Sequence, residues 1–307
     1  MKRKIYQVDA FTSVPYSGNP AGVMTNADGL SSKQMQLIAK EMKLSETAFV
    51  LSGSSDYDFE VRFFTPTEEV DLCGHATIAT FSLLKEIGMI EKSKREIIQK
   101  TKAGNLSIKL LENGTVLMRQ ADPVKRSGTL SIDEICHAMN ITRDNIGIDG
   151  VMDLPEIWST GLWDILLPVQ SIEILKRMTP AMDHLTILIN KLEVVGVHAF
   201  TIDENNDLWC RNFAPACGIP EESATGTSNG ALGACLYSKG WNSVGTLSFK
   251  AHQGNWMNSP SEIFVQVKGG NKPEVWVGGK AITVIEGEIL LPDINCKVTV
   301  PKDFQLK

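Results

Sequence analysis

Several features that mark large classes of protein are missing from this chain of 307 residues. No run of residues approaches the roughly 18 consecutive apolar residues of a membrane-spanning helix. No GxGxxG follows an expected strand and no GxxxxGK[ST] occurs, so the common nucleotide and flavin fingerprints are absent. None of the six cysteines belongs to a CxxC pair, which is the usual signature of structural zinc or a redox dithiol. We therefore expect neither a cofactor nor a metal.

Basic residues are outnumbered and do not cluster. The chain has 30 Lys and Arg against 36 Asp and Glu, and its formal net charge is −6. Without a basic patch, nucleic acid and anionic membranes are poor candidates as partners. The N-terminal sequence MKRKIYQVDAF is basic but lacks the apolar segment of a signal peptide. The cysteines are scattered, at positions 73, 136, 210, 217, 235 and 296. In a chain of this length such cysteines are typically reduced thiols, so we expect a cytoplasmic protein.

The apolar residues that are present follow strand and helix periodicities in both halves of the chain. Hydrophobic residues make up 43% of the sequence, and the length is typical of two domains. An Asn-Gly pair at 113–114 predicts a hairpin within 106–120. Helices are predicted at 31–44, 131–139 and 179–192. Strands are predicted at 5–11, 46–51, 56–64, 196–202, 207–213, 246–252, 262–268 and 274–279.

Two segments of the chain repeat one pattern. The motif R-x-F-x-P occurs at 62–66 and again at 211–215, each time after a strand that contains Ala-Phe. Gly74 and Gly88 are 14 residues apart, as are Gly226 and Gly240. The second copy has three extra residues between its proline and its glycine. Because the matches keep their order across strand, turn and helix, we interpret them as an internal duplication of one domain.

Each copy continues from its glycine into a helix that is rich in small residues. Such a helix can lie deep against a surrounding sheet, and its N-terminus then presents unpaired N–H groups and a positive dipole end. Two helix N-termini that face each other would bind a carboxylate or stabilise an enolate-like anion. The alternative is that Gly74 and Gly226 only make tight turns.

Five segments together resemble the phenazine-biosynthesis (PhzF-type) isomerase family, which has the diaminopimelate epimerase-like fold. They are VDAFTSVPYSGNPAGV (8–23), LSETAFV (44–50), VRFFTPTEEVDLCGHAT (61–77), RNFAPACGIPEESATGTSNGAL (211–232) and HQG (252–254).

The resemblance implies an α+β fold of two pseudo-symmetric domains, each a curled β-sheet or barrel around a central helix. We place the N-terminal domain at 1–122 plus 283–307 and the C-terminal domain at 128–282. The polar stretch 122–128 would be a linker, and a last strand at 280–291 would cross back to the first domain. The family also implies a homodimer and an active site between the domains.

The family's catalytic residues match positions of this chain. Its catalytic carboxylate falls on Glu46, which sequence alone would place on the surface, and its histidine falls on His75. A helix N-terminus lowers the pKa of an imidazole, which favours neutral His75. Glu222 and Thr227 complete the expected catalytic set. The expected substrate-binding residues are Asn19, Cys73, Gly74, Thr225, Gly226 and Gln253.

This sequence departs from the family pattern at two places. The pattern E-D-P-A-T-G-S is here EESATGT, so Glu222 stands at the aspartate, Ser223 at the proline and Thr227 at the serine. After HQG, the usual Gly-Arg is replaced by Asn258-Ser259, which removes a possible contact to an anionic substrate. Both changes argue against identity with the phenazine enzyme itself and leave the substrate open.

Cys73 raises the main mechanistic alternative. Related epimerases and racemases place a cysteine before the glycine of each half, whereas the second half here has Thr225, and Cys217 is out of register. A lone thiol at a helix N-terminus would have a lowered pKa and be reactive, or it could simply fill space. The sequence thus predicts a cofactor-independent isomerase that moves a proton on a small carboxylated metabolite, with Glu46 as the acid–base group. A Cys73-dependent epimerase and a catalytically silent ligand-binding protein are the alternatives.

Overall fold

The fold is described by a computed structural model of residues 1–128, 130–241, 245–270 and 272–292. Within these residues no helix is long and apolar enough to cross a membrane. Cys296 and the expected domain segment 293–307 lie outside them.

The helices are α1 (Ser32–Met42), α2 (Gly74–Glu86), α3 (Ile132–Met139), α4 (Ile172–Arg177), α5 (Met182–Leu192) and α6 (Gly226–Ser238). The strands of the first half are β1 (Lys2–Ala10), β2 (Asn19–Met24), β3 (Thr47–Ser52), β4 (Phe59–Phe64), β5 (Glu69–Val70), β6 (Glu96–Thr101), β7 (Gly104–Leu110) and β8 (Val116–Arg119). The others are β9 (Val124–Arg126), β10 (Glu156–Ser159), β11 (Trp163–Pro168), β12 (Gly196–Ile202), β13 (Leu208–Ala214), β14 (Ile219–Glu222), β15 (Thr246–Gln253), β16 (Ser261–Lys268), β17 (Glu274–Gly279) and β18 (Ala281–Leu290).

The two halves of the chain build their sheets in the same order. In the first half, β2 runs parallel to β3, β3 pairs antiparallel with β4, β4 runs parallel to β6, and β7 and β8 follow antiparallel. In the second half, β11, β12, β13, β15, β16 and β17 repeat these five pairings and their directions. The predicted duplication is therefore present strand by strand, and the α+β fold class is confirmed.

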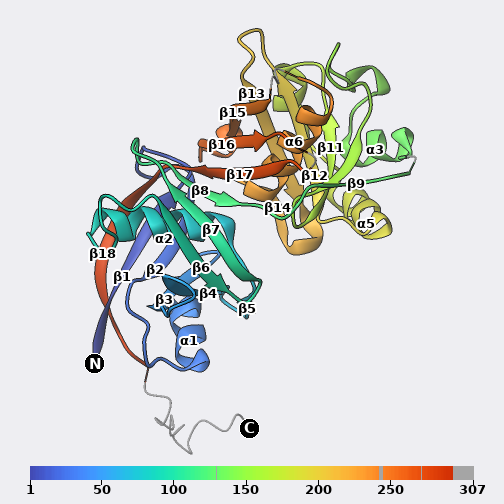
Figure 1. Ribbon diagram of the computed structural model, residues 1–307. Helices are drawn as coiled ribbons and strands as arrows, with labels where there is room; N and C mark the ends of the chain where they lie inside the picture. The colour runs from blue at the N-terminus through green and yellow to red at the C-terminus, as the bar shows by residue number, and fades with distance from the viewer. Residues whose placement is uncertain (129, 242–244, 271, 293–307) are drawn as a thin grey trace, which may run out of the picture.

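Each half also lends a strand to the other. The last strand, β18, pairs with β1 along its length, as Figure 1 shows with red beside blue. The predicted crossing of residues 280–291 to the first half is thus confirmed. The stretch 122–128 was expected to be a linker, but it contains β9, which pairs with β10 of the second half. The domain boundaries at 122, 128 and 283 stay a prediction. Between the two crossings, β8 and β17 pair with each other and join the halves.

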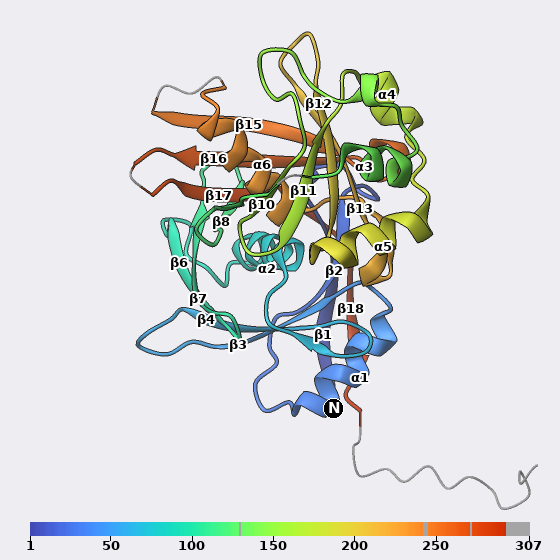
Figure 2. The same cartoon turned by 90° about the vertical axis from the view of Figure 1, so that its right-hand side faces the viewer.

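The central helices are enclosed by sheet. Nine residues of α2 and nine of α6 are buried, so both are covered on nearly every side. Figure 2 looks almost along α2 and shows strands of the first half around it. In α6 the close fit depends on glycine: a Cβ at Gly233 would lie 2.6 Å from Val265 Cγ1. Small residues therefore let the helix lie close to its sheet, as the sequence predicted.

The repeated arginine has a partner that the motif did not reveal. Arg62 donates two hydrogen bonds to Glu69, at 2.7 and 2.8 Å, and Arg211 donates two to Glu221, at 2.8 and 2.7 Å. Each guanidinium also lies over the phenylalanine two residues later. A planar guanidinium suits both contacts at once. The motif therefore fixes β5 and β14, the short strands that lead to α2 and α6.

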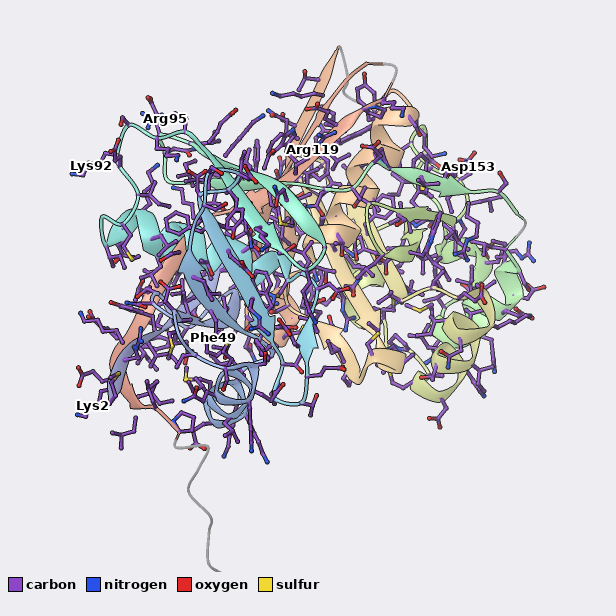
Figure 3. The ribbon with its side chains drawn as sticks, turned by 60° about the horizontal axis from the view of Figure 1, so that its bottom comes forward. Lys2, Phe49, Lys92, Arg95, Arg119 and Asp153 are labelled. Carbon is purple, nitrogen blue, oxygen red and sulfur yellow. The ribbon has the colours of Figure 1, made fainter. Side chains whose placement is uncertain are left out.

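Charged and apolar side chains separate as expected for a folded core. Figure 3 shows Lys92 and Arg95 on the connection between α2 and β6, where both are exposed. Phe49 of β3 is fully buried and packs edge-on against Phe64 of β4 at a centroid distance of 5.4 Å. This core holds the start of β3, and with it Glu46, in a fixed position.

Candidate active site

The two central helices begin in the same way, without a side-chain cap. Cys73 precedes α2 and Thr225 precedes α6, and neither side chain caps the helix that follows. By contrast, α1, α3 and α4 begin at serines whose hydroxyls accept a hydrogen bond from the first turn. The first N–H groups of α2 and α6 are thus not satisfied by an N-cap, and they carry the positive end of each helix dipole.

Both helix starts lie at the junction of the halves. A Cβ on Gly74 would lie 3.7 Å from Met118 of β8, and one on Gly226 would lie 3.5 Å from Val277 of β17. Met118 and Val277 are paired residues of the β8–β17 ladder. The two helix starts therefore both lie against one pair of the β8–β17 ladder. Both of these distances are ordinary contacts, so the protein's own packing does not require glycine at either position.

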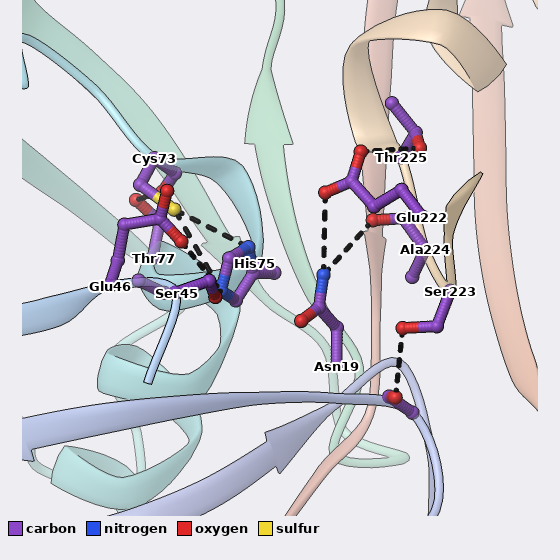
Figure 4. A network of polar contacts seen from close by, with 12 residues as sticks. Asn19, Ser45, Glu46, Cys73, His75, Thr77, Glu222, Ser223, Ala224 and Thr225 are labelled. Carbon is purple, nitrogen blue, oxygen red and sulfur yellow. Dashed lines mark hydrogen bonds and ion pairs between the residues drawn. The ribbon is translucent and has the colours of Figure 1, made fainter. Parts of the chain in front are cut away.

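The start of α2 carries a cluster of a carboxylate, a thiol and an imidazole (Figure 4). His75 Nε2 lies 3.3 Å from Glu46 Oε2 and 3.3 Å from Ser45 Oγ. On the other side of the ring, Nδ1 lies 3.4 Å from Cys73 Sγ. Glu46 Oε2 is buried but has no hydrogen-bond partner of good geometry among the described residues. A buried carboxylate oxygen without a partner is available to accept a proton.

Burial sets the protonation of this cluster. It lowers the pKa of His75, an effect that the charge of Glu46 only partly offsets, so the imidazole is neutral near pH 7. The expected neutral histidine is obtained, although mainly through burial. Burial, reinforced by the charge of Glu46, raises the pKa of Cys73 well above its ordinary value. The expectation of a lowered thiol pKa was wrong because desolvation and a carboxylate outweigh the helix dipole.

A second cluster lies at the start of α6, around Glu222 at the end of β14. Glu222 Oε2 accepts a hydrogen bond of 2.8 Å from Thr225 Oγ1, and Oε1 lies 3.4 Å from Asn19 Nδ2. Burial raises the pKa of Glu222 to about 7 against the hydrogen bond from Thr225, and the charge of Glu46 adds to the rise. Asn19 belongs to the first half, so this site is assembled from both halves. Glu222 is thus an acid that exchanges its proton near neutral pH.

Comparison with known proteins shows which family the chain belongs to. Residues 8–287 match the family described as phenazine biosynthesis-like protein. The chain belongs to this family. It is 35% identical to the uncharacterized isomerase CA_C3446 of Clostridium acetobutylicum, over 94% of this chain and 99% of that protein. It is 30% identical to trans-2,3-dihydro-3-hydroxyanthranilate isomerase of Pseudomonas chlororaphis, over 92% of this chain and 98% of that enzyme.

Solved structures agree with the sequence relatives. A Bacillus anthracis phenazine biosynthesis protein of the PhzF family superposes with a TM-score of 0.85 at 30% identity, covering 95% of this chain and 100% of that one. A hydroxyproline epimerase from Agrobacterium vitis shares the fold with a TM-score of 0.64 at 14% identity, over 95% and 94% of the two chains. The chain is therefore an isomerase of the phenazine biosynthesis-like family with an epimerase-like fold.

The positions that depart from the family pattern take part in defined contacts. Ser223, at the family's proline, donates a hydrogen bond of 3.1 Å to the carbonyl of Gly18 in the first half. Ser259, at the family's arginine, closes a turn through its N–H, which donates to the Gly254 carbonyl at 3.2 Å. The extra methylene of Glu222 is accommodated between Thr225 and Asn19. The departures thus lie in turns and contacts around the start of α6.

Two predicted site residues of the α6 side have different surroundings. Gln253 is fully buried, accepts from Thr225 N–H at 3.3 Å and donates to the Glu222 carbonyl at 2.8 Å. These contacts favour a supporting role for Gln253 over direct contact with substrate. Thr227 is the second residue of α6 and partly exposed, and its carbonyl accepts from Thr160.

The sequence did not reveal a buried polar chain beneath the start of α6. Ser228 donates to Asp164 Oδ2 at 2.7 Å and accepts from Asn212 at 3.1 Å, and Asn212 lies 3.3 Å from His198 Nδ1. Burial raises the pKa of Asp164 to about 7 and lowers that of His198 to about 4. A lone aspartate inside the apolar run WDILLP was the available signal, but no strand was predicted there. Ser45 was missed because only its position beside Glu46 points to it.

A cysteine precedes only one of the two central helices, as the sequence predicted. Thr225 precedes α6 where Cys73 precedes α2, and Cys217 lies in an exposed turn before β14.

The ligand atoms of Glu46, Cys73 and His75 all lie within 4.8 Å of one another, a separation that suits a metal ion. The expectation that the chain uses no metal stays a prediction.

Proposed function

We propose that this isomerase moves a proton on a small carboxylated metabolite without a cofactor, and that Glu46 is the acid–base group. The observation that carries the proposal is the buried Oε2 of Glu46, which lies 3.3 Å from His75 Nε2, accepts no hydrogen bond of good geometry from the described residues, and stands beside an uncapped helix start. Removing a proton from carbon needs a base within hydrogen-bond reach and donors for the negative charge that develops. Both requirements can be met at the junction of the halves.

The substrate carboxylate would lie in a cleft between the two helix starts. The N–H groups that follow Cys73 and Thr225 would donate to it, and neighbouring positive dipole ends would stabilise the enolate-like charge. Glycine at 74 and 226 leaves this space free of Cβ atoms, which supports the close approach of a ligand. Glu46 would take the proton from one carbon and return it to another.

His75 and Glu222 would complete the reaction from either side. Neutral His75 contacts both Glu46 and Cys73, so it can orient the carboxylate or relay its proton. Glu222 titrates near neutral pH, and in its protonated form it can donate to the substrate. Thr227, which is partly exposed on the first turn of α6, would contact the substrate, and so would the amide of Asn19.

Two alternatives have less support. A two-thiol racemase requires a cysteine at Thr225, and the raised pKa of Cys73 disfavours a thiolate nucleophile or base. A silent binding protein would have no use for a base with a free oxygen next to an anion site. The expected assembly is a homodimer in the cytoplasm, and sedimentation of the purified chain would measure its size.

The test begins with a screen of small carboxylic acids by thermal shift and by turnover. The substrate named for the Pseudomonas chlororaphis relative is the first compound to try, because it carries a carboxylate. Glu46→Gln keeps shape and removes the base, so it should bind the ligand but isomerise it roughly 10²-fold or more slowly. The matched control is Glu41→Gln on α1, where the carboxylate is exposed. Near-normal turnover by Glu46→Gln would rule out this mechanism.

A further inference from the structure

The cluster at the start of α2 has the composition of a zinc site. It offers a thiol, an imidazole and a carboxylate, the three ligand types that catalytic zinc sites combine. Cys73 and His75 are 8% and 7% exposed, so the ligands come from a largely dry pocket. Glu46 adds an oxygen that is buried and has no partner of good geometry. A cation would satisfy this oxygen, to which no described residue donates a hydrogen bond of good geometry.

The ligand atoms lie close enough together to share one ion after a rotation of the thiol. Zinc bonds of about 2.3 Å to sulfur and about 2.0 Å to nitrogen or oxygen place neighbouring ligand atoms about 3.3 to 3.6 Å apart. His75 Nε2 is 3.3 Å from Glu46 Oε2 and 4.0 Å from Cys73 Sγ. Sγ lies nearer to His75 Nδ1, at 3.4 Å, so the thiol would have to rotate toward Nε2 to complete three corners of the tetrahedron. The fourth corner would be left for water.

We propose that Glu46, Cys73 and His75 bind a thiophilic divalent cation such as Zn²⁺, and that the bound cation inhibits the isomerase. On binding, the sulfur–hydrogen bond of Cys73 is replaced by a sulfur–metal bond, and the thiol proton passes to solvent. No electron transfer is involved. The carboxylate that would accept the substrate proton then serves as a ligand, so metal and substrate exclude each other.

The second helix start lacks this capacity, which makes the site specific. Thr225 and Thr227 stand where α2 has Cys73 and His75, and a hydroxyl is a weak ligand for zinc. Among the described residues, the α2 cluster is the single group of three or more such ligands within bonding distance of one ion. Elsewhere, His137 and His184 stack at a centroid distance of 4.2 Å and offer nitrogen ligands without sulfur.

Cobalt(II) in place of zinc tests the site without any substrate. A cobalt–thiolate bond gives a near-ultraviolet charge-transfer band, so the purified full-length chain titrated with Co²⁺ should show this band at one equivalent. Cys73→Ser should abolish the band, and Glu46→Gln should weaken Co²⁺ binding by roughly tenfold or more, since it removes a charged ligand. Cys217→Ser, at an exposed cysteine, is the matched control and should keep the band.

The outcomes separate cleanly. The site would be overturned if the unaltered chain gave no band, or if the band survived Cys73→Ser. It would also be overturned if Glu46→Gln left the affinity for Co²⁺ unchanged. Binding of Co²⁺ without a band would assign the ion to nitrogen ligands such as the stacked histidines. Once a substrate is known, Zn²⁺ should inhibit competitively and a chelator should restore turnover. Inhibition that is not competitive would overturn the second part of the proposal. The cobalt band is read without turnover, so its failure is distinct from failure of the proposed isomerase activity.

Discussion

The two helix starts share a scaffold but carry different chemistry. Both follow a short strand held by an arginine–glutamate pair, and both approach the Met118–Val277 pair. The α2 start bears a carboxylate, a thiol and a neutral imidazole, whereas the α6 start bears Glu222, two threonines and a buried polar chain. The duplication thus supplies two similar helix starts that carry different side chains, and the proposed mechanism gives acid–base roles to both.

The strand ladders show where each difference was introduced. Phe63 pairs with Val70 in the first half, and at the same place in the second half Asn212 pairs with Glu222. An apolar pair has therefore become a polar one on the α6 side. Beneath the helices, Ala76 of α2 corresponds to Ser228 of α6, which bonds to Asp164. The second start is held by hydrogen bonds where the first is held by apolar packing.

The buried acid of the second half should give the largest effect, and it acts on stability. The pKa of Asp164 is raised to about 7 by burial, so the folded chain binds a proton that the unfolded chain has released. Its contribution to stability is complete below pH 4 and is lost as the pH rises through about 7. Between pH 5 and pH 8, the loss of this proton should lower the free energy of unfolding by about 2 to 3 kcal/mol. Asp164→Asn should remove that part of the pH dependence, as urea unfolding at several pH values would measure.

An exposed aspartate provides the control for this experiment. Asp133→Asn on α3 should leave the slope of unfolding free energy against pH as it is in the unaltered chain. If Asp164→Asn also leaves the slope unchanged, Asp164 does not titrate as the buried acid of the second half.

Glu222 should give the next largest effect, through the pH dependence of turnover. With a pKa of about 7, Glu222 is protonated below neutral pH and ionised above it. If the protonated form donates to substrate, kcat/KM should fall as the pH rises through about 7. Glu222→Gln should lower activity by roughly tenfold and remove this inflection, because the amide donates at every pH. Persistence of the inflection in the variant would assign it to another group.

Cys73 should give the smallest effect. Its thiol is kept protonated by burial and by Glu46, and no second cysteine matches it at α6. Cys73→Ser should therefore reduce turnover by less than about tenfold, as steady-state kinetics would show. A loss of roughly 10²-fold or more in a normally folded variant would favour the cysteine-dependent alternative and would make the two helix starts even less alike.

Much of the fold could be predicted because the repeat carries it. The R-x-F-x-P motifs, the glycine spacing and the Asn113-Gly114 hairpin are local signals, and each corresponds to a structural element. The crossing of β18 was implied by the family resemblance. The reciprocal crossing of β9 was missed because three residues with exposed or half-buried side chains carry no strand periodicity. Its pairing depends on β10, which lies far along the chain.

The candidate site could be predicted by residue type but not by environment. Glu46, His75 and Glu222 were placed at the helix starts from motif positions, and the structure brings them there. The pKa of Cys73 was predicted in the wrong direction because desolvation depends on what surrounds the sulfur, which no local pattern encodes. Asp164 was missed for the same reason, since its importance comes from burial under α6.

The central claim is that one carboxylate, Glu46, removes the proton and returns it. The most direct measurement is isomerisation of the identified substrate in heavy water, with deuterium counted in the product by nuclear magnetic resonance. The unaltered enzyme should place less than one deuteron per turnover at the new position, because a shielded carboxyl group returns part of the original proton. Glu46→Gln should lose isomerisation and exchange together, by roughly 10²-fold or more. Exchange or turnover at the normal rate in Glu46→Gln would contradict the claim and transfer the base to the α6 side.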